Sequence, residues 1–504
     1  MHGNLGLYHD GTSAYVPARH PPPEIPVQEL LSRGGGLNVL LSDHLPLDRA
    51  AVDSRISSCK RQQYDISNLP KASVVIIFHN EPFSTLLRSV HSVLNLTPPP
   101  LLEEIILVDD GSDLDYITGS RRFMTATAAA GPGGSVEGER QFAAVKFSDG
   151  EAEVIEYGSA EDEEEDRRRL ARLRSRSQHT QQPALPGSPN YRVTPTLKEY
   201  LELLPEKVKL LRNKERKGIV GARMRGIRAA KAPVFVILDS HIEVQPQWME
   251  PLLLRIAADR HRIVMPQIDG IEADTFEYAA GGIGCKLGFL WKLMEHSYES
   301  HQVARFAASS VKALRSRAPP PVVATAVEGA EQGGGATGDE IGGKILTPVG
   351  SAETSPVMAG GLFAADKTFF FEIGAYDEAF QYWGTENLEL SFRLWQCGGL
   401  LECAPCSRVY HIFRKGGAGY SVPPQAVTVN KMRTLLWMDQ YADLAWRVLG
   451  KPRVDFGWES LQQRKKWREE KKCKNFEWFL HNVFPEGDVV DLRDVPYLGR
   501  TKAH

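Results

Sequence analysis

The sequence lacks several features that would assign it quickly to a common class of protein. It has no run of about 18 apolar residues, the length that a membrane-spanning helix needs. Its start, Met-His-Gly-Asn, has neither the basic nor the apolar stretch of a secretory signal peptide, so we expect none there. A formal charge of -3 over 504 residues argues against a nucleic-acid partner. The two common phosphate-binding glycine loops, Gly-x-Gly-x-x-Gly after a strand and Gly-x-x-x-x-Gly-Lys-Ser/Thr, are absent too.

Cysteine is scarce and scattered. The six cysteines are Cys59, Cys285, Cys397, Cys403, Cys406 and Cys473. The pair at 403 and 406 has zinc-ligand spacing, but no second Cys/His pair lies at zinc-finger distance. The spacing alone therefore leaves disulfides and free thiols equally open.

Three stretches show little periodicity. Residues 1–36 are rich in Pro and Gly and predict a flexible lead-in. Residues 118–205 contain acidic and then Arg-rich blocks, and residues 307–355 are rich in Pro and Gly, so we expect two insertions rather than domains. The apolar fraction of 42% is ample for a globular core. We expect that core in residues 37–495, with 496–504 as a tail.

The most informative stretch is 234–241, in which an apolar run leads directly into Asp239, Ser240 and His241. Such a run predicts a strand buried on both faces, as in a parallel sheet. Asp239 and His241 would then project to the same side at its carboxyl end, where a carboxylate and an imidazole suit a divalent metal such as Mn²⁺. The simpler interpretation is a helix-capping Asp and a buried His.

The surrounding pattern is that of alternating strands and helices. Residues 71–78 and 104–110 predict strands on either side of a helix at 83–96, which is a βαβ unit. Polar clusters follow three of the expected strands: His79, Asn80 and Glu81; Asp109 and Asp110; Asp239 and His241. Each alone could be a solvated strand end, but together they would line the edge of the sheet on which a nucleotide would bind. Since no glycine loop is present, something else would have to hold the phosphates, and a metal is the obvious candidate.

A second group of polar residues lies between 355 and 415. Two glycines at 360 and 361 would let backbone approach a ligand closely, and residues 383–387 predict a turn before a helix over 389–396. Residues 409–415 bring His411 next to two cations. His411 could be a third metal ligand, with structural or surface roles as the alternative.

These motifs, taken together, resemble the polypeptide N-acetylgalactosaminyltransferases, which start mucin-type O-glycosylation. The resemblance covers roughly residues 37–495 apart from the two insertions. The matching segments are 73–81, 84–88, 104–110, 216–218, 238–241, 248–253, 358–363, 383–387, 391–399, 405–406, 411–415, 437–439 and 473–476.

The resemblance implies a fold, a reaction and a set of site residues. The fold would be α/β of the GT-A glycosyltransferase type, with a Rossmann-like nucleotide-binding half joined to an acceptor-binding half. The reaction would move N-acetylgalactosamine from UDP-GalNAc to Ser/Thr of a polypeptide with retention. By this similarity the Mn²⁺ ligands would be Asp239, His241 and His411. The donor would contact Asp110, Arg216, Ser240, Trp383, Arg414 and Tyr420, and the sugar would be surrounded by Gly360, Gly361, Glu386 and Asn387, of which Glu386, Asn387 and Arg414 would be catalytic.

The resemblance also implies disulfides between Cys59 and Cys406 and between Cys397 and Cys473. These fit the oxidising secretory pathway and a Golgi lumenal enzyme. The family's amino-terminal membrane anchor and carboxy-terminal lectin domain have no counterpart in this sequence. We therefore expect membrane attachment only through an anchor outside it.

The sequence departs from the family pattern at several positions. The segment Gly281-Gly-Ile-Gly-Cys285 replaces a Phe-Asp-Trp stretch that helps to hold the acceptor, and Thr385 replaces a glycine. Ile77 stands where some members carry a donor-contacting Thr, and the loop 416–419 is one residue longer than expected. Two alternatives therefore stay open: a transferase for another sugar or acceptor, and an inactive relative that binds UDP or glycopeptide.

Overall fold

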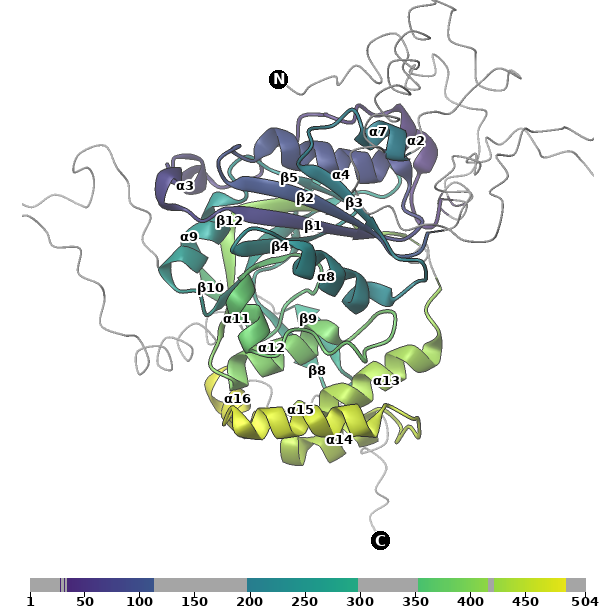
Figure 1. Ribbon diagram of the computed structural model, residues 1–504, viewed down its shortest axis with the longest axis vertical. Coiled ribbons are helices and arrows are strands. Elements are labelled where there is room, and N and C mark those ends of the chain that lie inside the picture. The colour runs from purple at the N-terminus through teal and green to yellow at the C-terminus, as the bar shows by residue number, and fades with distance from the viewer. Residues whose placement is uncertain are drawn as a thin grey trace, which may run out of the picture.

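A ten-stranded mixed sheet organises the fold, with the strand order β10-β12-β6-β11-β4-β1-β2-β3, to which β5 and β7 are added at β12 and β6 (Figure 1). The computed structural model describes residues 34–112, 197–297, 352–415 and 421–485, together with Gln28 and Leu31. The strands of this sheet are β1 Ala72–Phe78, β2 Leu102–Asp109, β3 Val208–Arg212, β4 Val234–Asp239, β5 Ile242–Val244, β6 Arg262–Ile271, β7 Tyr278–Ile283, β10 Glu353–Thr354, β11 Phe363–Asp366 and β12 Leu400–Ile412.

The first half of the sheet is parallel, as the alternating pattern predicts. Strands β4, β1, β2 and β3 lie side by side in parallel register, so that Asp239 aligns with Ile77, which in turn aligns with Val108. Helices α4 (Phe83–Leu96) and α8 (Gly218–Ala229) follow β1 and β3, and α9 (Glu250–Ala258) follows β5. The expected strands and helices in this half are confirmed within about two residues at most ends.

Helices cover both faces of the sheet, and this explains why its strands are apolar throughout. Successive residues of a strand point to opposite faces, so Val74 packs into the cluster under α4 and α9, while Val75 packs into the cluster with α8. The second cluster continues into α12 (Glu386–Gln396) and the helices near the carboxyl end of the described chain. The cluster includes buried residues of α11 (Lys367–Glu372), α14 (Ala442–Val448) and α16 (Phe476–Asn482), and Trp467 of α15 (Trp458–Glu470) packs against it. Helices α13 (Pro424–Thr434) to α16 form the lowest layer in Figure 1.

The second half of the sheet brings residue 411 to the end of β4. Strand β11 pairs antiparallel with β4 and β6, and β12 runs parallel to β6. The short strand β5, just after the Ser240–His241 turn, pairs antiparallel with β12 so that Ile242 lies opposite His411. This pairing, between residues far apart in the chain, assembles the site.

A separate two-stranded hairpin lies near α12. Strands β8 (Leu287–Leu290) and β9 (Met294–Ser297) pair antiparallel, with Phe289 opposite Glu295. The remaining short elements are the helices α2 Val39–His44, α3 Ser57–Lys60 and α7 Leu197–Leu201, and the 3₁₀ turns η1 Ile66–Asn68, η3 Leu435–Trp437 and η4 Asp439–Tyr441.

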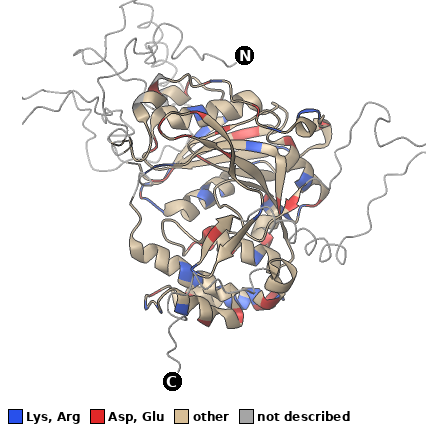
Figure 2. Cartoon of the chain, turned by 180° about the vertical axis from the view of Figure 1, so that it is seen from behind, with Lys and Arg blue, Asp and Glu red and all other residues tan. Residues whose placement is uncertain are grey.

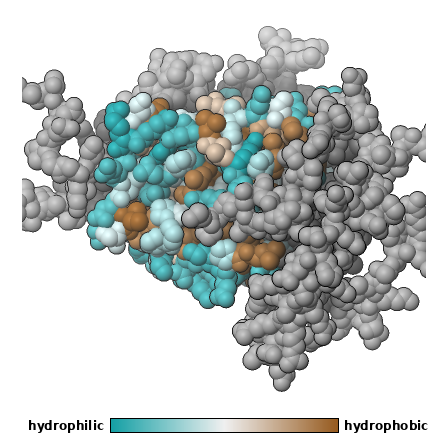
Figure 3. Space-filling view, turned by 90° about the horizontal axis from the view of Figure 1, so that it is seen from above, coloured by the Kyte–Doolittle hydropathy of each residue, from teal (hydrophilic) through white to brown (hydrophobic). Residues whose placement is uncertain are grey.

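The surface of the described part shows no single dominant character. Basic and acidic residues are interspersed over the strands and helices in Figure 2, in keeping with the near-neutral formal charge of -3. Seen from above, the coloured residues of Figure 3 show apolar side chains in small, separate patches. None of the helices described has the length and apolar character needed to cross a membrane.

Two expectations from the sequence need revision. Glu386 and Asn387 do not lie in a turn but open helix α12, whose N-cap is Thr385. Residues at the edges of the expected insertions are structured, since α7 contributes the fully buried Tyr200, and residues 353–354 form β10. The intervening residues 113–196 and 298–351 lie outside the described residues, as do Tyr420, most of the expected lead-in and the expected tail.

Candidate active site

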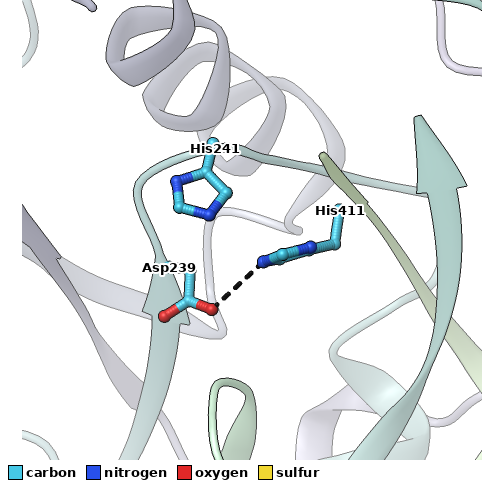
Figure 4. A group of neighbouring side chains, drawn as sticks. All are labelled: Asp239, His241 and His411. Carbon is cyan, nitrogen blue, oxygen red and sulfur yellow. Dashed lines mark ion pairs between the residues drawn. The ribbon is translucent and has the colours of Figure 1, made fainter. Parts of the chain in front are cut away.

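Asp239, His241 and His411 converge at the carboxyl end of β4. Figure 4 shows Asp239 at the end of the strand, His241 in the turn that follows and His411 on β12, with their side chains pointing toward one another. One ligand atom from each residue lies within 4.8 Å of those of the other two. His411 Nε2 is 3.3 Å from Asp239 Oδ2, and the two imidazole rings are 4.7 Å apart.

The residues present suit a divalent cation. One carboxylate and two imidazoles are ligands for first-row divalent metals, and the three side chains keep between 14% and 21% exposure, which leaves room for further ligands. Gly361 makes space for this arrangement, because a Cβ at that position would lie 2.4 Å from Asp239 Oδ2. The missing side chain of Gly361 thus leaves the space that the Asp239 carboxylate occupies.

Burial and neighbouring charges shift the pKa values of Asp239 and His411 in directions that suit a metal site. Burial by itself raises the pKa of Asp239, but the hydrogen bond with His411 and the charges of His411, His241 and Arg223 outweigh it, so the pKa lies well below its ordinary value. Burial is the main reason why the pKa of His411 is lowered, although Asp239 acts in the opposite direction. An ionised carboxylate beside a neutral imidazole is the state that binds a metal.

Glu81 supports this group from behind, a role that the sequence did not assign. Its carboxylate accepts a hydrogen bond from Ser240 Oγ at 2.9 Å and lies 3.2 Å from His241 Nδ1, while Arg414 donates to its other oxygen at 2.6 Å. Burial raises the pKa of Glu81, but the charges of Arg414 and His241 and its hydrogen bonds bring the pKa down to about 2. With Nδ1 facing this anion, His241 turns Nε2 toward the other two residues. The signal was present in the sequence as the polar end of β1.

Arg223 joins Asp239 to Glu386 and was likewise missed. This guanidinium, fully buried on α8, lies 3.8 Å from Asp239 Oδ1 and 3.4 Å from Glu386 Oε1, and it is 3.3 Å from the hydroxyl of Tyr376. Burial raises the pKa of Glu386, and Arg223 counteracts that effect. Sequence reasoning gave Arg223 no role at the site.

Asn387 is held beside the Gly360–Gly361 pair by two hydrogen bonds. Its Nδ2 donates to the carbonyl of Met358 at 3.0 Å and to Glu295 Oε2 at 3.2 Å. Gly360, at φ +91°, approaches so closely that a Cβ there would lie 2.8 Å from Asn387 Cβ. The Gly360–Gly361 pair therefore packs against both Asn387 and Asp239, and the structure brings these residues to one place.

Other residues expected at the site make contacts of their own with neighbouring elements. Asp110 is buried, and its carboxylate accepts hydrogen bonds from the backbone N–H groups of Lys217 and Gly218, both at 2.8 Å, so it joins the end of β2 to the start of α8. Arg216 packs over the ring of Tyr382 at 5.1 Å. Trp383 is 46% exposed just before α12.

Three disulfides brace this architecture. Cys59 is joined to Cys406 and Cys397 to Cys473, the two pairs that the resemblance implied. The third disulfide joins Cys285 to Cys403, two residues to which the resemblance gave no partner. It ties the segment after β7 to β12.

Two family patterns match the sequence. Residues 73–118 and 187–311 match the family described as Glycosyl transferase family 2. Residues 345–415 match the one described as the N-terminal domain of galactosyltransferase. The two matches include Asp239, His241 and His411.

Individual relatives point to one family. Polypeptide N-acetylgalactosaminyltransferase 13 of Rattus norvegicus is 34% identical over 460 residues, covering 90% of this chain and 61% of the relative. Polypeptide N-acetylgalactosaminyltransferase 5 of Caenorhabditis elegans is 33% identical over 459 residues, covering 89% of this chain and 54% of the relative. The chain thus spans between about half and two thirds of the length of these proteins.

A solved structure shows the same fold. The crystal structure of GalNAc-T7 with UDP, GalNAc and Mn²⁺ superposes with a TM-score of 0.62 at 28% identity, covering 94% of this chain and 69% of that one. The expected GT-A architecture is confirmed by this likeness together with the mixed sheet. Over about 90% of its length the chain is similar to the polypeptide N-acetylgalactosaminyltransferases.

Proposed function

We propose that the protein transfers N-acetylgalactosamine from UDP-GalNAc to Ser/Thr hydroxyls of polypeptides, with retention and in a Mn²⁺-dependent manner, and so initiates mucin-type O-glycosylation. The observation that carries the proposal is the meeting of Asp239, His241 and His411 at the carboxyl end of β4. Support comes from GalNAc-T7, a neighbour in fold that was crystallised with UDP, GalNAc and Mn²⁺. The proposed catalytic domain is 37–495, with the two insertions inside it.

Asp239, His241 and His411 would hold the Mn²⁺. When bound, a divalent cation supplies positive charge that offsets the charge developing on the leaving diphosphate. Arg414 would add a second cation there by donating to a phosphate oxygen. Ser240, Asp110, Arg216, Trp383 and Tyr420 would contact the donor.

The sugar would lie between the Gly360–Gly361 pair and the start of α12. Asn387 and Glu386 are buried there, and Glu386 faces Arg223 rather than standing free as a nucleophile. No other residue of the group is an evident covalent nucleophile. A front-face reaction through an oxocarbenium-like state accounts for retention, with the leaving diphosphate helping to take the proton of the acceptor hydroxyl.

The three disulfides favour an oxidising compartment, and we propose the Golgi lumen.

One observation favours a second candidate function, a transferase with another acceptor or sugar. Segment 281–285 lacks the aromatic residues that the family places there, and Cys285 is instead committed to a disulfide. The acceptor side of the proposed site therefore departs from the family pattern.

Incubation with Mn²⁺, a panel of UDP-sugars and a Ser/Thr-rich peptide tests the proposal. The mass shift of the peptide identifies the sugar transferred, and UDP release measures turnover. We expect a shift of one N-acetylhexosamine with UDP-GalNAc only, and no shift without Mn²⁺. A peptide mass shift with another UDP-sugar, or UDP release at the same rate with and without peptide, supports the second candidate. Binding of UDP without any turnover contradicts both.

A further inference from the structure

The hairpin β8–β9 carries a carboxylate to the sugar side of the proposed site. Glu295 lies opposite Phe289 in the hairpin, and residues directly opposite share a face. Phe289 is buried against Phe392 of α12, with ring centroids 5.1 Å apart. Glu295 therefore projects toward α12, where its Oε2 lies 3.2 Å from Asn387 Nδ2. Residue 295 lies outside all the motifs through which the sequence resembles the family.

This contact completes the hydrogen bonding of the Asn387 side-chain nitrogen, Nδ2. A side-chain amide has two N–H donors, and here one bonds to the carbonyl of Met358 at 3.0 Å and the other to Glu295. With both donors engaged, the amide cannot rotate without losing a bond, and Oδ1 is the atom left to accept from a ligand. A sugar hydroxyl or amide N–H is a donor that this oxygen can bind.

Covalent and backbone contacts hold the base of the hairpin. Leu287 pairs with Val357 as an isolated bridge, and its N–H donates to Ser355 Oγ at 2.9 Å. Two residues earlier, Cys285 is joined to Cys403 of β12. Val357 leads directly into Met358, so the hairpin is fastened to the same segment that binds Asn387.

We propose that Glu295 is a positioning residue that orients Asn387 to present Oδ1 to the donor sugar, and that the Cys285–Cys403 disulfide braces the hairpin that carries it. The inference rests on the proposed function, since it concerns the sugar side of the same site. The disulfide acts together with aromatic packing, since Phe289 and Trp291 of the same hairpin are both buried.

The test compares binding of UDP with binding of UDP-sugars to the Mn²⁺-loaded protein by calorimetry. The quantity measured is the Kd for UDP divided by the Kd for whichever of UDP-GalNAc, UDP-GlcNAc, UDP-galactose and UDP-glucose binds the wild type best. We expect Glu295→Ala to lower this ratio by about 3- to 10-fold while the Kd for UDP is unchanged, because one hydrogen bond that orients the sugar ligand is lost. Glu295→Gln keeps an acceptor oxygen and should retain most of the ratio. Met294→Ala, on the opposite face of the strand, should leave it unaltered.

A second comparison tests the brace. The double variant Cys285→Ser/Cys403→Ser should lower the same Kd ratio. The variant Cys59→Ser/Cys406→Ser removes a disulfide elsewhere, so it should lower Tm but leave the Kd ratio unchanged. An unchanged ratio in Glu295→Ala, or equal weakening of UDP and UDP-sugar, overturns the role of Glu295. An equal effect of the two disulfide variants on the ratio overturns the brace.

The proposed function fails separately from this inference. If a sugar nucleotide other than UDP-GalNAc binds best, the donor is wrong, and the ratio for that nucleotide still measures the effect of Glu295. If the wild type binds no UDP-sugar, both proposals are overturned.

Discussion

Replacing Glu81 by Gln should weaken Mn²⁺ binding without unfolding the protein. The carboxylate, only 5% exposed, is shared between His241 and Ser240 on one oxygen and Arg414 on the other. Glutamine has one acceptor oxygen and no charge, so it cannot serve both sides, and His241 loses the anion that faces Nδ1. Loss of such a partner behind a metal ligand typically lowers metal affinity by about 10- to 100-fold, or about 1.4 to 2.7 kcal/mol.

Titration of the protein with Mn²⁺, followed by the electron paramagnetic resonance signal of the free ion, measures this affinity directly. Glu103→Gln is the matched control, because Glu103 lies near the start of β2 and pairs with the exposed Lys71. Thermal melts of each variant without metal show whether the fold is retained. If Glu81→Gln binds Mn²⁺ as tightly as the wild type, Glu81 does not orient His241 for metal binding.

Three further predictions follow from the same geometry. His411→Ala should lose most turnover and Mn²⁺ affinity with an unchanged circular dichroism spectrum, and full transfer by this variant would remove His411 from the metal site. Thr385→Gly should raise the free energy of unfolding in urea by about 0.5 to 1 kcal/mol, because Thr385 has φ +71°, a conformation costly for a β-branched residue. An unchanged free energy of unfolding would mean that the strain is absent. Folding lowers the pKa of Glu81 from 4.5 to about 2, so its contribution to stability is complete above pH 4.5 and is lost as the pH falls toward 2. Metal-free wild type should therefore lose Tm faster over that window than Glu81→Gln, and parallel curves would contradict the depressed pKa.

Local pattern was enough to predict most of the parallel half of the fold. A strand buried on both faces needs a continuous apolar run, and a helix over a sheet needs apolar residues at helical spacing, so β1, α4, β2, α8 and β4 are visible in the sequence. The polar residues after these strands mark the edge where a ligand can bind, since parallel strands end together. Asp239 and His241 could be predicted together in this way, because both follow the same strand, β4.

Local pattern did not predict the contacts made by distant segments, and only the family resemblance grouped His411 with Asp239 and His241. His411 reaches Asp239 only because β12 lies beside β6 and pairs with β5, and no local periodicity encodes that order of strands. The same holds for Arg414 on Glu81 and for Glu295 on Asn387, each a pair of side chains from separate elements. A pattern of residues determines which surfaces an element buries, but which other element covers them depends on how the whole sheet packs. Sequence thus determined the elements and the chemical groups at their ends, and the tertiary structure decided which of those groups meet.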